Sequence, residues 1–486
     1  MVLCHWHWGG FQAKRLDQEF VMHLSQLSPV EFDTALIVKH DGSGPRYTSY
    51  PTADRFTTGL IAEQYVDALR LRQRDRSDDP LSLYVHLPFC DTVCYYCGCN
   101  KIATKDRGRA DQYLDYLEKE ISLICAQFSD QPKVSQLHLG GGTPTFLTNE
   151  QMERLLKMLH SNFQFSENAE CSVEVDPRRL NNGALSLMAS YGFNRMSIGV
   201  QDLDLAVQRA VNRIQPPEMT QAVLEQGRAL GYRSINLDLI YGLPLQSVKT
   251  MQATLNTVLQ WRPDRIALYS YAHLPERFMP QRRIESADIP LPSEKLAMLK
   301  LAVTTLLNAG YVYVGMDHFA LPEDELAQAL DNGTLQRNFQ GYSTYADCDL
   351  IALGVSAISR VGDVYAQNQK ELDAYYADLD QGKLPLIKGL VSNSDDNLRR
   401  VVIHDLLCQS EVNIREIEAK WAIQFDTYFM DDMNQLKELE ADGLVQLNRD
   451  FIRVTPKGRF LARVVAMRFD QYLRNAKTHA KYSKVI

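Results

Sequence analysis

The stretch LSLYVHLPFCDTVCYYCGCN (residues 81–100) decides the fold, because it leads from an apolar run directly into a cluster of cysteines. Residues 81–89 are mostly apolar, as expected of a buried strand. Cys90, Cys94 and Cys97 follow at the spacing C-x3-C-x2-C, which lets one short loop direct three thiolates at a common centre. The stretch therefore predicts a metal or iron–sulfur site at the end of a strand.

The cysteine loop leaves several interpretations open. Thiolate ligands select zinc or iron–sulfur clusters, but structural zinc usually takes a second cysteine or histidine pair from another segment, and none follows at a suitable distance. Cys99 lies so close to Cys97 that a fourth ligand from this position would strain the loop. Three thiolates on a [4Fe–4S] cluster would leave one iron open to a small molecule, an arrangement suited to catalysis. Structural zinc and four incidental or redox-active cysteines are the alternatives.

Around this loop, the chain alternates between apolar runs and helical patterns. The apolar runs, with the motifs that end them, lie at 81–89, 134–144, 171–177, 195–201, 234–244, 265–273 and 311–319. The helical patterns lie at 60–73, 111–128, 149–162, 180–191, 203–212, 218–230, 247–260 and 293–309. Strands that alternate with helices of this length predict βα units and a parallel sheet.

Six of the apolar runs end in a polar or Gly/Pro motif. After the cysteine loop these motifs are GGGTPT, EVDP, GVQ, DLIYGLP and YAHLP. In βα barrels the chemistry lies at the carboxyl ends of the strands, so we expect the six motifs to converge on one mouth. Six βα units and a seventh strand favour an α/β fold with a complete or incompletely closed TIM-like barrel over a doubly wound sheet. No G-x-G-x-x-G follows the first strand, which weakens the dinucleotide-binding alternative.

The chain divides into three predicted parts: an N-terminal extension and arm (1–75), the barrel with its extensions (76–390) and a small helical domain (391–486). The arm includes GPRYTSYPTADRF, which has no helical or strand period and predicts an ordered loop. The last part has helical patterns at 395–407, 412–421 and 428–444, then a hairpin entering a final helix at 445–462, as in a winged helix. We expect it to cover the barrel rather than to bind DNA, because it is not strongly basic.

Composition restricts the function further. The chain has 486 residues and a net charge of −8, so it lacks the large basic field that general nucleic-acid binding needs. It has no run of about 18 apolar residues that could span a membrane, and its start does not resemble a secretory signal. Nine cysteines, an odd number thinly spread outside the loop, do not form a disulfide framework. We therefore expect a cytoplasmic protein without nucleic-acid or membrane partners.

The motifs together resemble the radical S-adenosylmethionine (SAM) enzymes, and among them the oxygen-independent coproporphyrinogen III oxidases. The resemblance rests on YVHLPFCDTVCYYCGCNK, LHLGGGTPTFL, EVDPR, IGVQD, NLDLIYGLP and YSYAHLP. It extends from GPRYTSYP at residue 44 through RNFQGYST and YAQNQKELDAYY to the C-terminus, and does not cover residues 1 to about 30. A bare C-x3-C-x2-C is moderately specific, whereas its combination with GCN, GGGTPT and PRYTSYP is strongly specific.

The resemblance implies a set of site residues. Cys90, Cys94 and Cys97 would hold a [4Fe–4S] cluster whose open iron binds the methionine part of SAM, and Cys99 would support the loop. SAM, in one or two molecules, would be bound by Tyr84, Tyr96, Gly141, Gly142, Thr143, Glu174, Gln201, Arg213, Asp238, Ala272 and Ile358. Tyr84 is expected at the end of the first strand, and Arg213 is suited to a carboxylate because its fork matches two oxygens. No acid–base residue is implied, because the cofactor carries the hard chemistry.

The reaction implied is the conversion of two propionates of coproporphyrinogen III to vinyl groups with loss of CO2, giving protoporphyrinogen IX through a 5′-deoxyadenosyl radical. We expect a monomer that receives electrons from a flavodoxin- or ferredoxin-type protein. The substrate carries four carboxylates, so cations are needed near the mouth, and Arg46 and Arg337 are candidates. A haem chaperone of the same superfamily and a metal-sensing regulatory protein with a winged helix are the competing interpretations.

Overall fold

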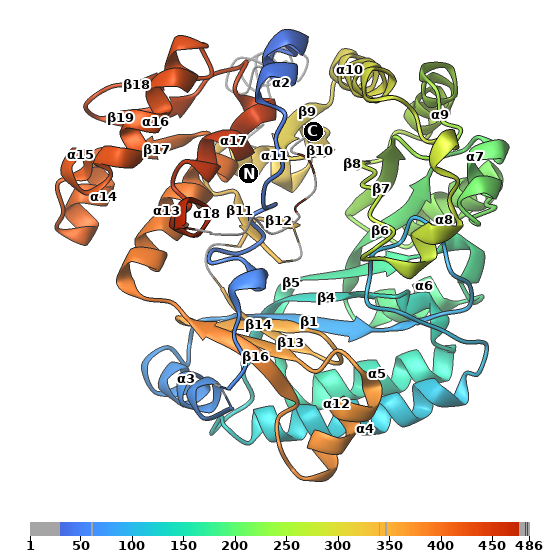
Figure 1. Ribbon diagram of the computed structural model, residues 1–486. Coiled ribbons are helices and arrows are strands. Elements are labelled where there is room, and N and C mark those ends of the chain that lie inside the picture. The colour runs from blue at the N-terminus through green and yellow to red at the C-terminus, as the bar shows by residue number, and fades with distance from the viewer. Residues whose placement is uncertain are drawn as a thin grey trace, which may run out of the picture.

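The computed structural model describes residues 30–59, 62–339, 341–345, 348–475, 482 and 484. Its centre is a 12-stranded sheet in the order β16-β15-β14-β13-β1-β4-β5-β6-β7-β8-β10-β9. The sheet curves without closing on itself (Figure 1). Its strands are β1 (Leu81–Leu87), β4 (Lys133–Gly141), β5 (Gln164–Val175), β6 (Phe193–Gln201), β7 (Ser234–Tyr241), β8 (Arg265–Ser270), β9 (Val312–Gly315), β10 (His318–Ala320), β13 (Asp349–Leu353), β14 (Ile358–Val361), β15 (Val364–Asn368) and β16 (Leu386–Val391).

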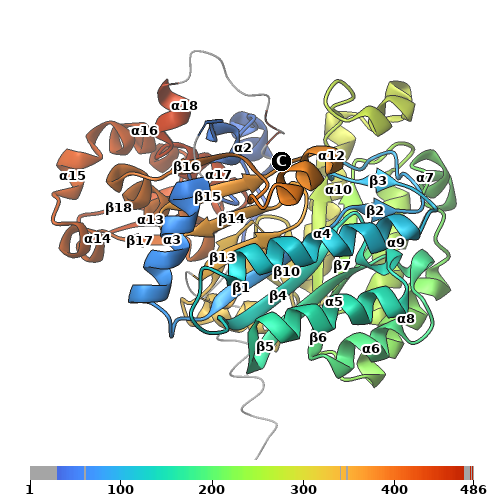
Figure 2. The ribbon, with the colours of Figure 1, turned by 90° about the horizontal axis from the view of Figure 1, so that it is seen from below.

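The strands from β13 to β8 pair in parallel, with helices along the outside of the sheet (Figure 2). These helices are α4 (Gly108–Cys125), α5 (Asn149–Asn162), α6 (Ala184–Ser190), α7 (Leu205–Ala210), α8 (Pro217–Ala229), α9 (Val248–Trp261) and α10 (Pro292–Asn308). The helix predicted at 149–162 has these same bounds, because Thr148 and Gln151 form a capping box at its start. The expected incompletely closed barrel is confirmed.

The prediction of one continuous strand at 311–319 is wrong. The structure divides it into β9 and β10, which pair with each other in an antiparallel hairpin, and β10 pairs antiparallel with β8. Met316 and Asp317 have φ angles of 39° and 83°, which reverse the chain between the two strands. The seventh parallel strand is instead β13, which lies on the other side of β1. An apolar run shows that a segment is buried but does not show a turn within it.

Glu120, a buried residue of α4, links this helix to the segments around β13 and β15 and to α12 (Leu372–Asp380). Glu120 of α4 accepts hydrogen bonds from the Gly354 amide (2.7 Å), Asn368 Nδ2 (2.6 Å) and the Tyr375 hydroxyl (2.6 Å). Tyr375 belongs to α12. Burial raises the pKa of Glu120 to about 7, although the three hydrogen bonds favour its ionised form.

We expect the stability difference between the native protein and a Glu120→Leu variant to shrink as pH rises from about 5 to 8. A carboxyl whose folded-state pKa is raised binds more protons when folded than when unfolded, so its contribution to stability falls between its unfolded pKa and its folded pKa of about 7. Thermal unfolding of both proteins at several pH values measures the difference. A difference that is constant or that grows over this range contradicts the assignment.

The C-terminal domain packs around its own core. It contains α13 (Ser394–Cys408), α14 (Ile414–Trp421), α15 (Phe425–Tyr428), α16 (Met430–Ala441), α17 (Ala462–Met467), α18 (Gln471–Asn475) and a small sheet of β17 (Glu411–Asn413), β19 (Phe451–Val454) and β18 (Val445–Leu447). Three longer helices and a hairpin confirm the winged-helix-like pattern, and β17 is an addition that the sequence did not predict.

The N-terminal arm packs against this domain. The arm contains helices α2 (Thr34–His40) and α3 (Ala62–Asp75), and the predicted loop over residues 44–56 lies between them. Tyr47 and Tyr50 are buried in the core of the C-terminal domain, and the Tyr47 hydroxyl donates to Asp470 Oδ2 at 2.9 Å. The sequence predicts a solvated basic tail, of which residues 476–481, 483, 485 and 486 lie outside the described residues. The Tyr482 hydroxyl in that tail donates to Asp54 of the arm at 2.8 Å.

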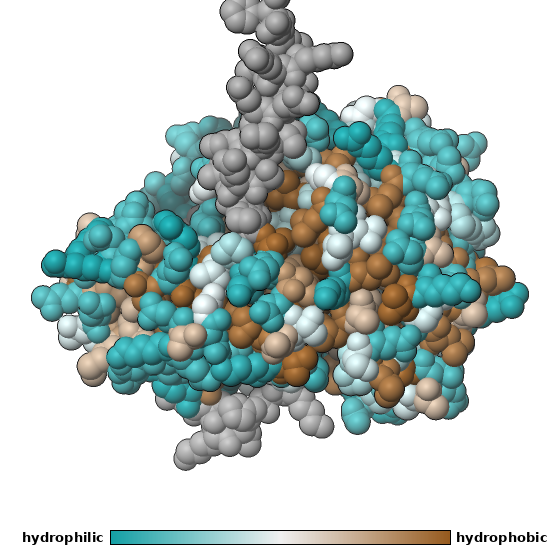
Figure 3. All heavy atoms as spheres, turned by 90° about the horizontal axis from the view of Figure 1, so that it is seen from above, coloured by the Kyte–Doolittle hydropathy of each residue, from teal (hydrophilic) through white to brown (hydrophobic). Residues whose placement is uncertain are grey.

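The surface is mixed in polarity. Figure 3 shows one face, on which hydrophobic residues lie among hydrophilic ones. The most exposed apolar side chains include Met279 and Leu291, in the connection between β8 and α10. Across the described residues, none of the helices combines the length and apolar character needed to cross a bilayer. The N-terminal extension, to which the sequence assigns no role, falls outside the described residues up to residue 29.

Candidate active site

The cysteine loop is held at both ends by a short parallel ladder. In it, β2 (Phe89–Cys90) pairs with β3 (Ile102–Ala103). Within the loop, the Cys97 amide donates to the Cys94 carbonyl at 3.2 Å. The Cys94 thiol is buried, those of Cys90 and Cys97 are partly exposed, and all three are unpaired. The loop therefore presents three thiols at the end of β1, as the spacing predicts.

The electrostatic surroundings of the thiols differ. Burial raises the pKa of Cys90 to about 12, and the neighbouring Cys97 and Cys94 contribute in the same direction. A hydrogen bond from the Cys99 side chain lowers the pKa of Cys97 to about 6 despite burial, and Lys101 adds to this effect. Two guanidinium groups approach Cys94 Sγ, from Arg178 at 3.5 Å and Arg213 at 3.8 Å. Cationic groups thus lie beside the thiols, as thiolate ligands require.

The three cysteines fit an iron–sulfur cluster. Among the described residues, no three histidine, cysteine or acidic side chains converge closely enough to hold a single metal ion. A four-iron cluster binds each thiolate through a different iron, so its ligands do not need to converge on one atom. The three thiols come from one short loop, whose ends are held by the β2–β3 ladder and whose Cys97 amide donates to the Cys94 carbonyl. Three thiolate donors on one loop therefore suit a cluster better than a zinc ion.

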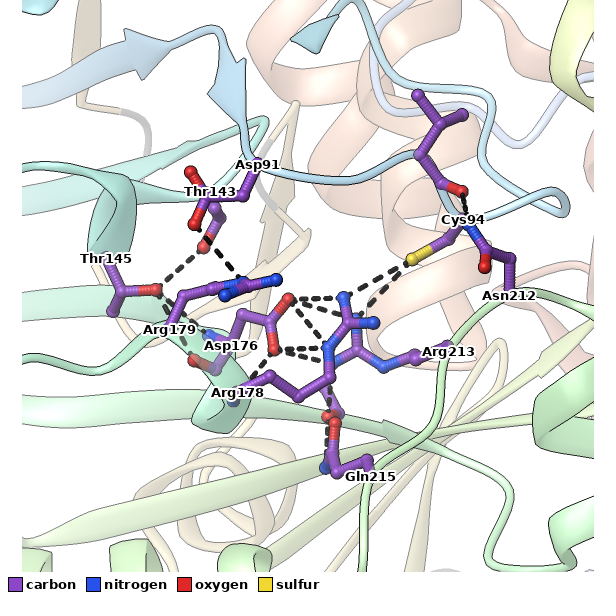
Figure 4. A network of polar contacts seen from close by, with 12 residues as sticks. Asp91, Cys94, Thr143, Thr145, Asp176, Arg178, Arg179, Asn212, Arg213 and Gln215 are labelled. Carbon is purple, nitrogen blue, oxygen red and sulfur yellow. Dashed lines mark hydrogen bonds and ion pairs between the residues drawn. The ribbon is translucent and has the colours of Figure 1, made fainter. Parts of the chain in front are cut away.

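Beside the loop, a buried ion-pair network joins the ends of β5 and β6 (Figure 4). Asp176 pairs with Arg178 at 2.6 Å and with Arg213 at 3.4 Å. Arg213 also donates to the Gly199 carbonyl at 2.7 Å, and its Nε is buried without a hydrogen-bond partner. Burial raises the pKa of Asp176, but the two arginines outweigh it and hold that pKa below its usual range. The sequence analysis selected Arg213 but missed Asp176 and Arg178, although both lie in the EVDPR motif that it quoted.

The glycine motif lets β4 end close to the cysteine loop. The Gly142 amide donates to the Leu87 carbonyl at 2.8 Å, and the Thr143 amide donates to the Phe89 carbonyl at 3.0 Å. A Cβ at Gly142 would lie 2.5 Å from the Pro88 carbonyl oxygen, so a side chain cannot fit there. Gly141 has a φ of 122°, which favours glycine. These residues bring the backbone of β4 against the segment that leads to the thiols.

A row of polar side chains lines the concave face of the sheet. Tyr84 lies in the middle of β1 rather than at its end, so its predicted position is wrong, because the strand continues to Leu87. Its hydroxyl lies 3.0 Å from His86 Nδ1, and its ring stacks on that of His138 at 5.8 Å. His138 Nε2 lies 3.4 Å from Glu174 Oε1, and the Gly141 amide donates to Glu174 Oε2 at 3.2 Å. Glu174 is therefore held beside the glycine motif.

Asp238 and Glu174 line a cavity of about 190 Å³ within the curve of the sheet. Asp238 accepts hydrogen bonds from Ser197 Oγ at 2.9 Å and Asn236 Nδ2 at 2.8 Å. Burial raises the pKa of Asp238 to about 6, and these hydrogen bonds only partly oppose the shift. The cavity can therefore accept a polar or cationic group.

The other predicted residues lie around the same edge of the sheet. Gln201 ends β6 with a φ of 70°, and the Tyr96 carbonyl in the cysteine loop accepts a hydrogen bond from Gln281 at 3.1 Å. Ala272 follows β8 and lines a second cavity of about 680 Å³. Ile358 begins β14, which runs antiparallel to β13, so it too lies at the carboxyl edge. Ala272 follows β8 at one end of the parallel series, whereas Ile358 belongs to β14, next to β13 at the other end.

Comparisons with known proteins define the class of protein first. Residues 84–258 match the Radical SAM superfamily, and residues 393–461 match the HemN C-terminal domain. The first match spans the cysteine loop and the strands from β4 to β7. The fold and the three-cysteine loop therefore define a radical SAM protein, and this class implies a [4Fe–4S] cluster and SAM as cofactors.

Relatives of full length define the family. The chain is 48% identical over 462 residues to the oxygen-independent coproporphyrinogen III oxidase of Pseudomonas aeruginosa, with 95% of this chain and 100% of that protein covered. It is 42% identical to the oxidase of the same name from Synechocystis, with 94% and 98% covered. The structure of coproporphyrinogen III oxidase from Escherichia coli, described as a radical SAM enzyme, superposes with a TM-score of 0.87 at 47% identity over 91% of this chain and all of that one. The chain belongs to the family of oxygen-independent coproporphyrinogen III oxidases.

Proposed function

We propose that this protein is an oxidoreductase of porphyrin biosynthesis that converts coproporphyrinogen III to protoporphyrinogen IX without oxygen. Each of two propionates loses carbon dioxide, one hydrogen atom from its β-carbon and one electron, and becomes a vinyl group. The observation that carries the proposal is the three-cysteine loop at the carboxyl edge of the open sheet, in a chain that matches full-length oxidases of this name. When bound, the cluster and SAM supply the one-electron chemistry that removes a hydrogen atom from unactivated carbon.

The residues of the chain would position the cofactors. Cys90, Cys94 and Cys97 would hold the cluster, and the carboxylate of Glu174, fixed by the Gly141 amide, is suited to an amino group. The unpaired Nε of Arg213 offers a buried donor for a carboxylate. The remaining proposed SAM contacts are Tyr84, Tyr96, Gly142, Thr143, Gln201, Asp238, Ala272 and Ile358.

The proposal includes three further expectations. A flavodoxin- or ferredoxin-type protein would supply the electron, the protein would act as a monomer, and it would work in the cytoplasm. The division into parts at 1–75, 76–390 and 391–486 also stays a proposal, supported by the separate core of the C-terminal helices. Tyr47 and Tyr50 of the arm are buried in that core, which supports the proposal that the arm and the C-terminal domain fold against each other.

An anaerobic assay tests the function. We expect the reconstituted protein to contain about four iron and four sulfide ions per chain, and to form protoporphyrinogen IX from coproporphyrinogen III with SAM and a strong reductant. Chromatography of the oxidised products measures the conversion. Tight haem binding without any conversion would instead identify a haem carrier and overturn the proposal.

A further inference from the structure

Two arginines lie on segments between the sheet and the C-terminal domain. Arg46 belongs to the N-terminal arm, and Arg337 belongs to β11 (Gln336–Asn338), which forms a hairpin with β12 (Gly341–Ser343). Figure 1 shows the N-terminal segment in blue and this hairpin between the red C-terminal domain and the green strands. The arginines therefore belong to covering segments and not to the parallel strands.

A row of aromatic rings connects the two guanidinium groups. Arg46 Cζ lies 5.8 Å from the centre of the Tyr269 ring on β8, and Arg337 Cζ lies 4.9 Å from the centre of the Tyr342 ring on β12. The His318 ring stands between these tyrosines, edge-on to both, at 6.0 Å from Tyr269 and 5.4 Å from Tyr342. One arginine thus lies at each end of the row.

The rings of this row are neutral, so its positive charge comes from the two arginines and is partly offset by Asp317, which pairs with Arg46. Burial, followed by the charge of Arg337, lowers the pKa of His318 to about 3, so the imidazole is neutral. Burial and then Arg337 also lower the pKa of Arg46. Two positive charges are therefore held close enough to repel each other, an arrangement that an anionic ligand would stabilise.

Two hydrogen-bond donors of the Arg337 side chain are unsatisfied. Its Nε and Nη1 atoms are buried and have no hydrogen-bond partner among the described residues. Its backbone amide donates to His404 Nε2 at 3.0 Å, which fixes the strand rather than the side chain. Unsatisfied buried donors are unfavourable, and the guanidinium fork matches a carboxylate in two parallel hydrogen bonds.

Arg46 has one acidic partner and faces a large cavity. It forms an ion pair with Asp317, which lies in the turn between β9 and β10. Arg46, Asp317 and Ala272 all line the cavity of about 680 Å³, a volume within the usual range for small-molecule sites. A carboxylate that enters this cavity can share or replace Asp317 as the partner of Arg46.

We propose that Arg46 and Arg337 bind propionate carboxylates of the substrate and make the site selective for a porphyrinogen with several acidic side chains. This inference rests on the proposed function, because it takes the tetracarboxylate as the substrate. Tyr269, His318 and Tyr342, the aromatic row between the arginines, line the cavity of about 190 Å³ within the curve of the sheet, where they would contact the tetrapyrrole. The two arginines are binding residues and take no part in hydrogen-atom removal.

Binding of coproporphyrin III, the stable fluorescent form of the substrate, tests the assignment without turnover. In titrations of the anaerobic holoenzyme, we expect Arg337→Gln and Arg46→Gln each to weaken binding by about tenfold or more, the effect of losing a charge-assisted bidentate pair. The tetraamide of coproporphyrin III, which lacks the carboxylates, should bind the native protein and both variants with similar, weak affinity. Unchanged binding of the tetracarboxylate, or equal weakening of both ligands, would overturn the proposal.

Matched variants separate binding from folding. Arg337→Lys keeps the charge but loses the fork, so its affinity should fall between those of the native protein and Arg337→Gln. Arg453→Gln removes an exposed arginine that pairs with Glu411 in the C-terminal domain, and should bind as the native protein does. Iron content and melting temperature should be the same in all variants, whereas KM should rise more than kcat falls. An Arg337→Lys variant that binds as tightly as the native protein, with normal iron, would count against the fork.

The two proposals fail in different ways. A native protein that binds coproporphyrin III in preference to its tetraamide but forms no protoporphyrinogen IX would overturn the proposed function and leave the arginine site in place. A native protein that forms protoporphyrinogen IX while Arg46→Gln and Arg337→Gln keep their affinity and KM would overturn the arginine site alone.

Discussion

Replacing Cys97 by alanine is expected to remove the iron–sulfur cluster and to abolish formation of protoporphyrinogen IX. The loop offers three thiols at the carboxyl edge of the sheet, and no other cysteine lies between β2 and β3 except Cys99. Loss of a group that only orients a metal ligand already costs about 10- to 100-fold in affinity or activity. Loss of a ligand itself should therefore lower turnover by more than about 100-fold.

Iron analysis and the visible spectrum measure this result, with turnover as a second readout. Cys125→Ala is the matched control, because Cys125 is a partly buried thiol at the end of α4 whose pKa is raised by burial and which lies outside the loop. The control should keep about four iron ions per chain and native turnover. A Cys97→Ala variant with a full complement of iron and unchanged turnover would remove the basis for the cluster assignment.

Replacing Arg213 by methionine is expected to lower SAM-dependent turnover by about 100-fold while the cluster remains. Arg213 is only 6% exposed and joins Asp176, the Gly199 carbonyl and the sulfur of Cys94. Its removal leaves the Gly199 carbonyl with the Gln215 side chain as its only remaining donor among these side chains, and Asp176 with Arg178 alone. Breaking a buried ion pair lowers the free energy of unfolding by about 3–5 kcal/mol. Because Arg178 still pairs with Asp176, the loss of stability should lie at the lower end of that range.

Equilibrium dialysis with SAM, iron analysis and thermal unfolding distinguish a loss of SAM binding from a loss of the cluster or of stability. We expect weakened SAM binding, a melting temperature several degrees lower, native iron content and turnover reduced by about 100-fold, as for a displaced positioning group. Arg209→Met, in an exposed position on α7, should match the native protein in all four measurements. Unchanged SAM binding and kinetics in Arg213→Met would contradict a role for this residue at the cofactor site.

The sequence predicted much of the barrel because its signals are local. The apolar runs, the helix over 149–162 and the motifs that end the strands each depend on neighbouring residues, and parallel strands bring their carboxyl ends to one edge without further information. The cysteine spacing likewise belongs to a single loop, so its three thiols could be assigned before the fold was known. The resemblance to a family then supplied the cofactors and the set of contact residues.

Other features depended on partners that are distant in the sequence. Leu81 pairs with Asp349 where β1 meets β13, and no local period shows that this strand, rather than the run at 311–319, extends the parallel series. Asp176 meets Arg213 across 37 residues, and Glu120 accepts from Asn368 across 248. Such pairs are selected by burial, because a charge or carboxylate removed from water must find a partner wherever the packing places one.

By itself, the sequence determined the class of fold, the three thiols and the edge of the sheet at which the chemistry lies, because strand period and loop spacing act over a few residues. Only the tertiary structure decided which side chains surround those thiols and which donors stay unpaired. The sequence named Arg46 and Arg337 as candidate cations, and only the packing of the arm and the hairpin showed that they lie at opposite ends of one aromatic row. The physical reason is that packing and desolvation act between segments remote in the chain, and a sequence pattern does not record those distances.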